Sequence, residues 1–153
     1  MTTSRARMPT AAKALGALWF GAVGAIAAEA YKPLLPPETV FGLFVPICGA
    51  LGLLAGWRVA GALAGRGFNP AVATGLRTSV TLLFWALLLF SLREMLLRSM
   101  NRRYGGPTEA LVGTFDIMLD YVSVMGDPAF LGVLIAGGIG GGLFAEWGAR
   151  RWP

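Results

Sequence analysis

Residues 71–92 read AVATGLRTSVTLLFWALLLFSL, and Arg77 is the only charged side chain among them. An α-helix rises about 1.5 Å per residue, so about 20 apolar residues cross the roughly 30 Å hydrocarbon core of a bilayer. This stretch is therefore predicted to be a transmembrane helix. Its helical pattern continues to about Arg103, and a helix of that length would measure roughly 50 Å. We expect the part from Ser91 onward to project beyond the lipid.

Three further apolar runs predict three more spans, at about 11–30, 40–64 and 129–147. Of all residues, 56% are hydrophobic and 14% are charged, whereas soluble proteins have roughly 25% charged residues. We therefore predict an all-α membrane protein that forms one membrane domain over residues 1–153. It has four transmembrane helices, with the third at about 71–92, plus an amphipathic helix between the third and fourth.

The segment between the third and fourth spans is predicted to form a charged helical cap, at about 93–126. A helix is expected to restart at Pro107, because proline is favoured in the first turn. A helical wheel separates the acidic and apolar residues. On one side lie Glu109, Gly113, Asp116 and Asp120, and on the other Leu111, Phe115, Met118, Val122 and Met125. Three acids near a bilayer centre are costly, which argues against a fifth span here, although that alternative stays open.

Within this cap, an antiparallel turn near Gly105 would place Arg102 opposite Glu109 and Arg98 within reach of Asp116. We expect these ion pairs, together with a pair between Glu94 and Arg98, to hold the cap together. The alternative is that the same charged side chains form no ion pairs and are simply solvated by water. A third interpretation is an oxyanion site, since guanidinium groups and a helix N-terminus both favour anions. That site would use Arg102, Arg103 and the helix start at Pro107.

Glycines with four-residue spacing occur in the second and fourth spans, where small residues let helix backbones approach closely. They predict helix packing within one subunit, with a homo-oligomer interface as the alternative. A phosphate-binding loop is excluded, because no strand precedes the glycines and no lysine follows. The glycines are Gly52, Gly56, Gly137, Gly138, Gly141 and Gly142.

The scarcity of reactive side chains limits the chemistry of this chain. It has one cysteine, Cys48, and no histidine, so it offers neither an intramolecular disulfide nor a Cys/His zinc site nor an imidazole base. Cys48 lies in an apolar run and is expected to be a buried, unreactive thiol. We therefore predict no catalytic, cofactor or metal site, and no enzyme.

The net charge of +5 does not indicate nucleic-acid binding, because the basic residues lie mostly at the edges of apolar runs. With both termini cytoplasmic, more of them fall on the cytoplasmic side than outside. A cleaved signal peptide at the first run is the alternative there, and the length of that run argues against it. The cytoplasmic set is Arg5, Arg7, Lys13, Arg58, Arg66, Arg77, Arg150 and Arg151, against Lys32, Arg93, Arg98, Arg102 and Arg103 outside.

Four short motifs resemble the TrgA family of tellurium-resistance proteins, which are small inner-membrane proteins of alphaproteobacteria. The motifs are Met8-Pro-Thr-Ala-Ala-Lys13, Gly56-Trp-Arg58, Gly65-Arg-Gly67 and the stretch from Arg102 to Ala110. The resemblance covers nearly the whole chain in order and spacing. The chain departs from the family at Gly105, where an acid is frequent.

The resemblance implies a multi-pass protein of the bacterial inner membrane that is associated with resistance to tellurite or another toxic oxyanion. Reduction of tellurite would need thiols or a redox cofactor, so we expect a non-enzymatic role of unknown mechanism. Two alternatives are a small oligomeric transporter or channel subunit and a structural accessory subunit of a larger membrane complex. The expected partners are the lipid bilayer and either a second copy or another membrane protein.

Overall fold

The computed structural model describes residues 10–35, 42–100 and 105–151, and these residues form helices joined by short turns. Four of the helical stretches are long and apolar enough to cross a membrane: 11–34, 44–63, 68–100 and 128–151. The predicted all-α fold with four spans is thus confirmed. In chain order the elements are α1 (Thr10–Tyr31), the 3₁₀ turn η1 (Lys32–Leu34), α2 (Phe44–Ala55), the π-helical η2 (Gly56–Ala60), α3 (Gly61–Leu63), α4 (Phe68–Met100), α5 (Pro107–Val124) and α6 (Pro128–Arg151).

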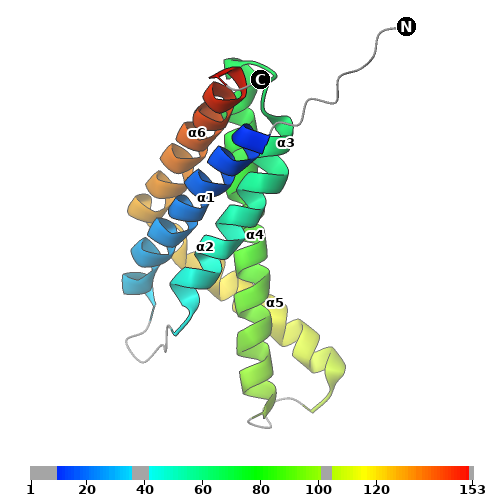
Figure 1. Cartoon of the computed structure of the whole chain (residues 1–153). Helices are drawn as coiled ribbons and strands as arrows, with labels where there is room; N and C mark the ends of the chain where they lie inside the picture. Colours follow the sequence, from blue (N-terminus) through cyan, green and yellow to red (C-terminus); the bar gives the residue numbers. More distant parts are fainter. Residues whose placement is uncertain (1–9, 36–41, 101–104, 152–153) are drawn as a thin grey trace, which may run out of the picture.

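The four spans form a bundle in which α1 packs against α2 and α6, and α4 packs against α6 and α2 (Figure 1). The start of α1, the turn between α3 and α4, and the end of α6 lie together at what we call the terminal end. At the opposite end, called the hairpin end, α4 projects beyond the other spans. There α5 folds back obliquely against α4 and leads into α6 (Figure 1).

Long charge-free stretches run through two of the spans, α1 and α4. In α1 no charge lies between Lys13 and Glu29, and in α4 none lies between Arg77 and Arg93. Each of these charge-free stretches rises about 24 Å from one flanking charge to the other. Long side chains extend outward from such positions to reach the surface of a roughly 30 Å core. The two stretches are offset along the bundle, because Leu82 of α4 lies beside Gly24 of α1.

Glycines bring α1 and α2 into backbone contact. A Cβ atom placed on Gly52 would overlap the carbonyl group of Phe20, and one on Gly56 would overlap the carbonyl group of Gly16. Because lipid tails are as apolar as the side chains, close packing is what holds such helices together. Both predicted packing glycines of the second span thus face α1 of the same chain.

The four predicted glycines of α6 divide between two neighbouring helices. Gly138 and Gly142 face α4, where a Cβ on Gly142 would overlap the carbonyl of Ala71 and one on Gly138 would lie 2.6 Å from the Ser79 hydroxyl. Gly137 and Gly141 face α1, and a Cβ on either would come within 2.8 Å of a side chain there. All six glycines therefore pack inside one subunit, which is the first of the two alternatives.

The second span contains one wide helical turn, η2. The backbone N–H of Gly61 donates to the carbonyl of Gly56, five residues earlier, where a regular α-helix would bond four residues back. This extra residue turns both glycines toward α1. A Cβ on Gly61 would lie 2.5 Å from the Cα of Lys13, and Gly56 faces Gly16.

Helix α5 has three faces. Its acids are exposed, as the wheel predicts, but the apolar residues opposite them are largely exposed as well: Leu111 is 60% and Phe115 66% exposed. A third face, with the buried Thr114 and Ile117, packs toward the rest of the protein. An apolar helix face is stable either against protein or against lipid. The helical wheel alone therefore does not show which face of α5 packs against the protein.

Candidate functional site

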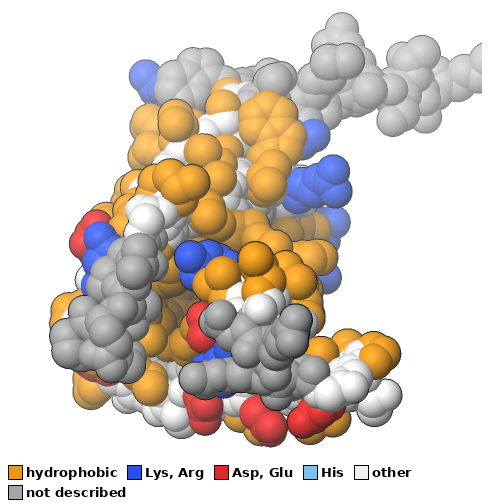
Figure 2. Space-filling model, turned by 90° about the horizontal axis from the view of Figure 1, so that it is seen from below, with side chains coloured by type: hydrophobic (Ala, Val, Ile, Leu, Met, Phe, Trp, Pro, Cys, Tyr) orange, Lys and Arg blue, Asp and Glu red, His pale blue; other side chains and the backbone are white. Residues whose placement is uncertain are grey.

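A cavity of about 310 Å³ opens at the hairpin end of the bundle. Ligand pockets begin at about this volume. The cavity lies between α1, α2 and α4, and α5 and α6 contribute to its walls. Seen from this end, the recess shows mainly hydrophobic side chains, with Lys or Arg and Asp or Glu side chains around it (Figure 2).

Small side chains create this space. Ala27 and Ala28 on α1 and Ala86 on α4 line it with short side chains, while Gly24 lines its inner end, where α1 packs so closely on α2 that a Cβ on Gly24 would overlap the carbonyl of Cys48. On the side of the terminal end, the fully buried ring of Phe20 lies one turn beyond Gly24 and fills the centre of the bundle. The cavity therefore enters from the hairpin end and stops near the middle of the spans.

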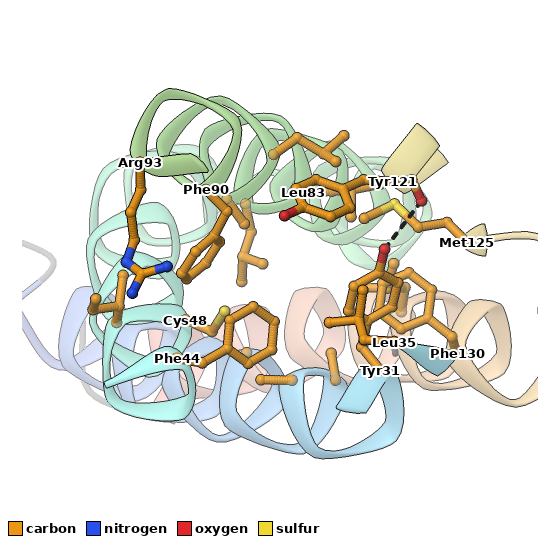
Figure 3. Close-up of a pocket in the computed structure, with 18 of the residues that line it drawn as sticks. Tyr31, Leu35, Phe44, Cys48, Leu83, Phe90, Arg93, Tyr121, Met125 and Phe130 are labelled. Carbon is orange, nitrogen blue, oxygen red and sulfur yellow. Dashed lines mark hydrogen bonds between the residues drawn. The ribbon is translucent and has the colours of Figure 1, made fainter. Parts of the chain in front are cut away.

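Four aromatic rings, one from each span, form a continuous wall of the cavity. The ring centroids of Phe90 and Phe44 are 4.6 Å apart, those of Phe44 and Tyr31 6.3 Å, and those of Tyr31 and Phe130 5.2 Å. The Tyr31 hydroxyl donates a 3.1 Å hydrogen bond to the carbonyl of Tyr121, which ties α5 to this wall (Figure 3). Aromatic pairs at these distances are favourable beyond their buried area.

Cys48 lies at the inner end of the cavity and is 5% exposed. Its burial agrees with the expectation of an inert thiol. Among the described residues, no group of three or more histidines, cysteines or acids is placed to hold a metal ion.

Polar side chains gather at the mouth of the cavity, where Arg93, Glu94 and Tyr121 line it. The Glu94 carboxylate accepts a 3.1 Å bond from the Arg98 Nε, which is the predicted i,i+4 pair. Burial is the main cause that raises the pKa of Tyr121, and Glu94 adds to it, while Arg98 and Arg93 oppose it. Tyr121 is therefore a neutral hydroxyl at the mouth.

Arg93 differs from its neighbour Glu94 in having no ion pair with any residue that the structure describes. No carboxylate of residues 10–35, 42–100 or 105–151 lies within 4.0 Å of its guanidinium nitrogens. Its side chain extends from α4 across the mouth, beside Phe90 (Figure 3). Among the described residues, the mouth therefore presents a guanidinium group without an ion pair next to an apolar interior.

The residues predicted to form the charged cap are only partly described. Arg102 and Arg103 lie outside the described residues, so the predicted pair of Arg102 with Glu109 and the oxyanion site remain predictions. The Glu109 carboxylate accepts a 2.7 Å bond from the backbone N–H of Gly105. Asp116 is exposed, and its pairing with Arg98 also remains a prediction.

One buried acid escaped the sequence analysis. Glu146 is 2% exposed, and its carboxylate accepts hydrogen bonds from the backbone N–H groups of Gly65 (2.6 Å) and Gly67 (3.0 Å) and from the Arg150 Nε (3.0 Å). Arg150 also lies 4.3 Å above the ring of Phe68. The acid thus fastens the turn between α3 and α4 to the end of α6.

The fold and the cavity together define a multi-pass all-α membrane protein with an amphiphilic recess at one end. Comparison with protein-family models, with characterised proteins and with solved structures gave no significant match.

Proposed function

We propose that this chain is a non-enzymatic, multi-pass protein of the bacterial inner membrane that raises tolerance to tellurite or a similar toxic oxyanion. The motifs that resemble the TrgA family support the link to tolerance. The apolar cavity supports an indirect role, exerted on the membrane or on a membrane partner.

The single observation that carries the non-enzymatic part is the chemistry of the cavity wall. Apart from its mouth, the cavity is lined by Gly24, by aliphatic and aromatic side chains, by the thioether of Met125 and by one thiol, Cys48. A hydrated oxyanion loses strong solvation when it enters such a space, and nothing there replaces the lost hydrogen bonds. One thiol also carries too few electrons to reduce tellurite to the element. The protein therefore raises tolerance without itself binding or reducing the oxyanion in this cavity.

Charge distribution supports an orientation with the termini in the cytoplasm. The terminal end has more basic residues than the hairpin end, where the described basic residues are Lys32, Arg93 and Arg98. Basic residues next to spans favour the cytoplasmic side. The described basic residues of the terminal end are Lys13, Arg58, Arg66, Arg150 and Arg151, and Arg77 lies further along α4.

The test is complementation in a tellurite-sensitive bacterial strain, with the wild-type chain compared with Cys48→Ser. We expect both to raise the lowest inhibitory tellurite concentration equally, and neither to change the rate at which isolated membranes reduce tellurite. Loss of tolerance together with loss of reduction in Cys48→Ser would establish an enzymatic role. No change in tolerance with the wild-type chain would overturn the proposed function altogether.

An accessory subunit of a larger membrane complex is the second candidate, and the apolar surface at the hairpin end favours it. Leu96 and Met100 on the projecting part of α4 are 59% and 80% exposed, and Leu119 on α5 is 66% exposed. Large exposed apolar patches mark contacts with lipid or with another protein. Isolation in mild detergent at native abundance tests this: a stoichiometric partner supports the accessory role, and a chain that purifies alone contradicts it.

A transporter or channel subunit finds less support in the fold. The cavity ends near mid-bundle, and Phe20 with the glycine-packed helices closes the remaining half. The parts of a single subunit that the structure describes therefore contain no continuous polar path. We expect liposomes that contain the purified chain to show no tellurite or phosphate flux above that of empty liposomes.

A further inference from the structure

We infer that the cavity binds an acyl chain that carries an anionic headgroup, with the headgroup on Arg93 and the chain inside the bundle. The inference is independent of the tolerance proposal, because it concerns what occupies the cavity and not its effect on the cell. It rests on three observations: the apolar lining of the cavity, the position of its polar mouth at the end of the charge-free stretch of α4, and an Arg93 side chain that has no ion pair with any described residue.

The interior suits a hydrocarbon chain. Beyond the mouth, the lining consists of apolar side chains such as Ile47, Leu82 and Leu134, and the volume is about 310 Å³. An apolar cavity of about half this size in a soluble protein stays dry and takes up apolar molecules. In a bilayer the surrounding solvent is itself hydrocarbon, so an acyl chain is the molecule at hand to fill the space.

The depth of the mouth fits a headgroup. Arg93 lies where the charge-free stretch of α4 ends, and it lines the polar mouth together with Glu94 and Tyr121. Lipid headgroups occupy this interfacial layer, while the acyl chains extend toward the middle of the bilayer. The cavity runs in the same direction, from a polar mouth to an inner end at Gly24 and Cys48.

The charge at the mouth selects an anion. Arg93 has no ion-pair partner among the described residues, whereas the adjacent Glu94 is paired with Arg98 at 3.1 Å. A guanidinium group binds carboxylate and phosphate oxygens through paired N–H donors, and such bonds strengthen where water is scarce. The Tyr121 hydroxyl also lines the mouth and supplies a neutral polar group. A neutral or cationic headgroup would not form an ion pair with Arg93.

Spin-labelled lipids in nanodiscs of neutral phosphatidylcholine provide the test, with the motionally restricted fraction as the readout. The probes are spin-labelled phosphatidylglycerol, stearate and phosphatidylcholine. We expect wild-type protein to restrict at least one anionic probe in preference to phosphatidylcholine. Arg93→Gln should lower this preference roughly tenfold, as expected for the loss of a charge-assisted hydrogen-bonded contact. The comparison of phosphatidylglycerol with stearate distinguishes a phospholipid from a free fatty acid.

Arg77→Gln is the matched control, because Arg77 is an exposed arginine of the same helix that does not line the cavity. It should keep the anionic preference. Ala86→Phe, which fills the cavity from α4, should abolish the restricted fraction of every probe. Cys48→Leu fills the inner end from α2 and serves the same purpose if Ala86→Phe does not fold.

The inference is overturned if phosphatidylcholine is restricted as strongly as both anionic probes, or if Arg77→Gln has the same effect as Arg93→Gln. It is also overturned if a folded variant with a filled cavity keeps the full preference, since binding would then lie elsewhere on the surface. Lipid binding without any effect on tellurite tolerance would refute the proposed function alone.

Discussion

The Glu146 carboxylate, near the end of α6, accepts a 2.6 Å hydrogen bond from the backbone N–H of Gly65, 81 residues earlier in the chain. The turn that contains Gly65 has backbone φ angles of +89° at this residue and +113° at Gly67, a region that favours glycine. The carboxylate of a residue on α6 thus stabilises the glycine turn that connects α3 and α4.

Glu146→Ala is expected to lower the stability of the bundle. The change removes the acceptor for two backbone N–H groups and the partner of Arg150, and we expect a loss of about 1–3 kcal/mol. Thermal unfolding in detergent, followed by circular dichroism, measures it.

Glu109→Ala is the control for this prediction. Glu109 also accepts a backbone hydrogen bond, from Gly105 at 2.7 Å, but the bond is exposed. Water replaces an exposed bond at little cost, so we expect a change within about 0.5 kcal/mol. Equal effects of the two substitutions would contradict the structural role of Glu146.

Gly75→Ala is expected to disrupt the contact between α4 and α6. A Cβ atom at this position would overlap the carbonyl of Gly138, and backbone cannot move aside without shifting a helix. We expect a loss of about 1–3 kcal/mol, measured by thermal unfolding. The oligomeric state, measured by light scattering, should not change, because the contact lies within one subunit.

Gly132→Ala provides the opposite case. Gly132 lies on α6, and a Cβ atom added there would meet no other atom within 4 Å. Alanine favours a helix over glycine by about 1 kcal/mol, so we expect this variant to be slightly more stable than the wild type. A loss here as large as that of Gly75→Ala would mean that the effect comes from the helix and not from the contact.

Ser91→Ala is expected to raise stability. The Ser91 hydroxyl is fully buried and has no hydrogen-bond partner among the described residues, and an unsatisfied buried polar group costs about 1–3 kcal/mol. In contrast, Ser79 on the same helix donates a 3.0 Å bond to the Leu134 carbonyl. Ser79→Ala should lose about 0.6 kcal/mol, the average for such bonds between membrane helices. Unfolding temperatures that fall in both variants would contradict the assignment of Ser91 as unsatisfied.

The proposed orientation predicts which turns are reachable from each side of the membrane. Thr108 lies at the hairpin end and Asn69 at the terminal end, and both are exposed. In a Cys48→Ser background, Thr108→Cys should react with a membrane-impermeant maleimide in intact spheroplasts. Asn69→Cys should react only after the membrane is opened. The reverse pattern would show that the termini face outward.

The four spans and the extra helix were predictable from the sequence because the hydrocarbon layer imposes a length on each apolar run. The predicted boundaries differ from the observed ones mainly where helices continue past the apolar run. For example, α6 extends to Arg151, whereas the apolar pattern predicted an end at about residue 147. The backbone bonds continue because helical hydrogen bonding does not depend on the polarity of the side chains.

The cavity and the Glu146 clamp were not predictable in this way. The cavity requires small residues of several helices to meet, and neither Gly24 nor Ala86 carries a signal of its own. Glu146 binds backbone N–H groups, which every non-proline residue has, so its partners have no sequence signature. The glycine turn at 65–67 and the arginine four residues after Glu146 were the only hints. The predicted Arg102 contacts lie outside the described residues and stay predictions.

The wide turn at η2 divides the second span into two helical segments. It shifts the directions in which the side chains of the second segment point, relative to those of the first. Side chains from Phe44 to Ala55 follow one rotational setting, which aims Phe44, Ile47 and Cys48 at the cavity. After Gly61, each residue faces the direction that the preceding residue would face in an uninterrupted α-helix. Deleting a single residue from this turn would therefore close it as a regular α-helical turn and leave Gly61 facing Lys13, whereas a deletion in the regular part of α2 would rotate the residues on either side of it by about 100° relative to each other. The second span thus consists of a first part that lines the cavity and a second part that packs against the start of α1.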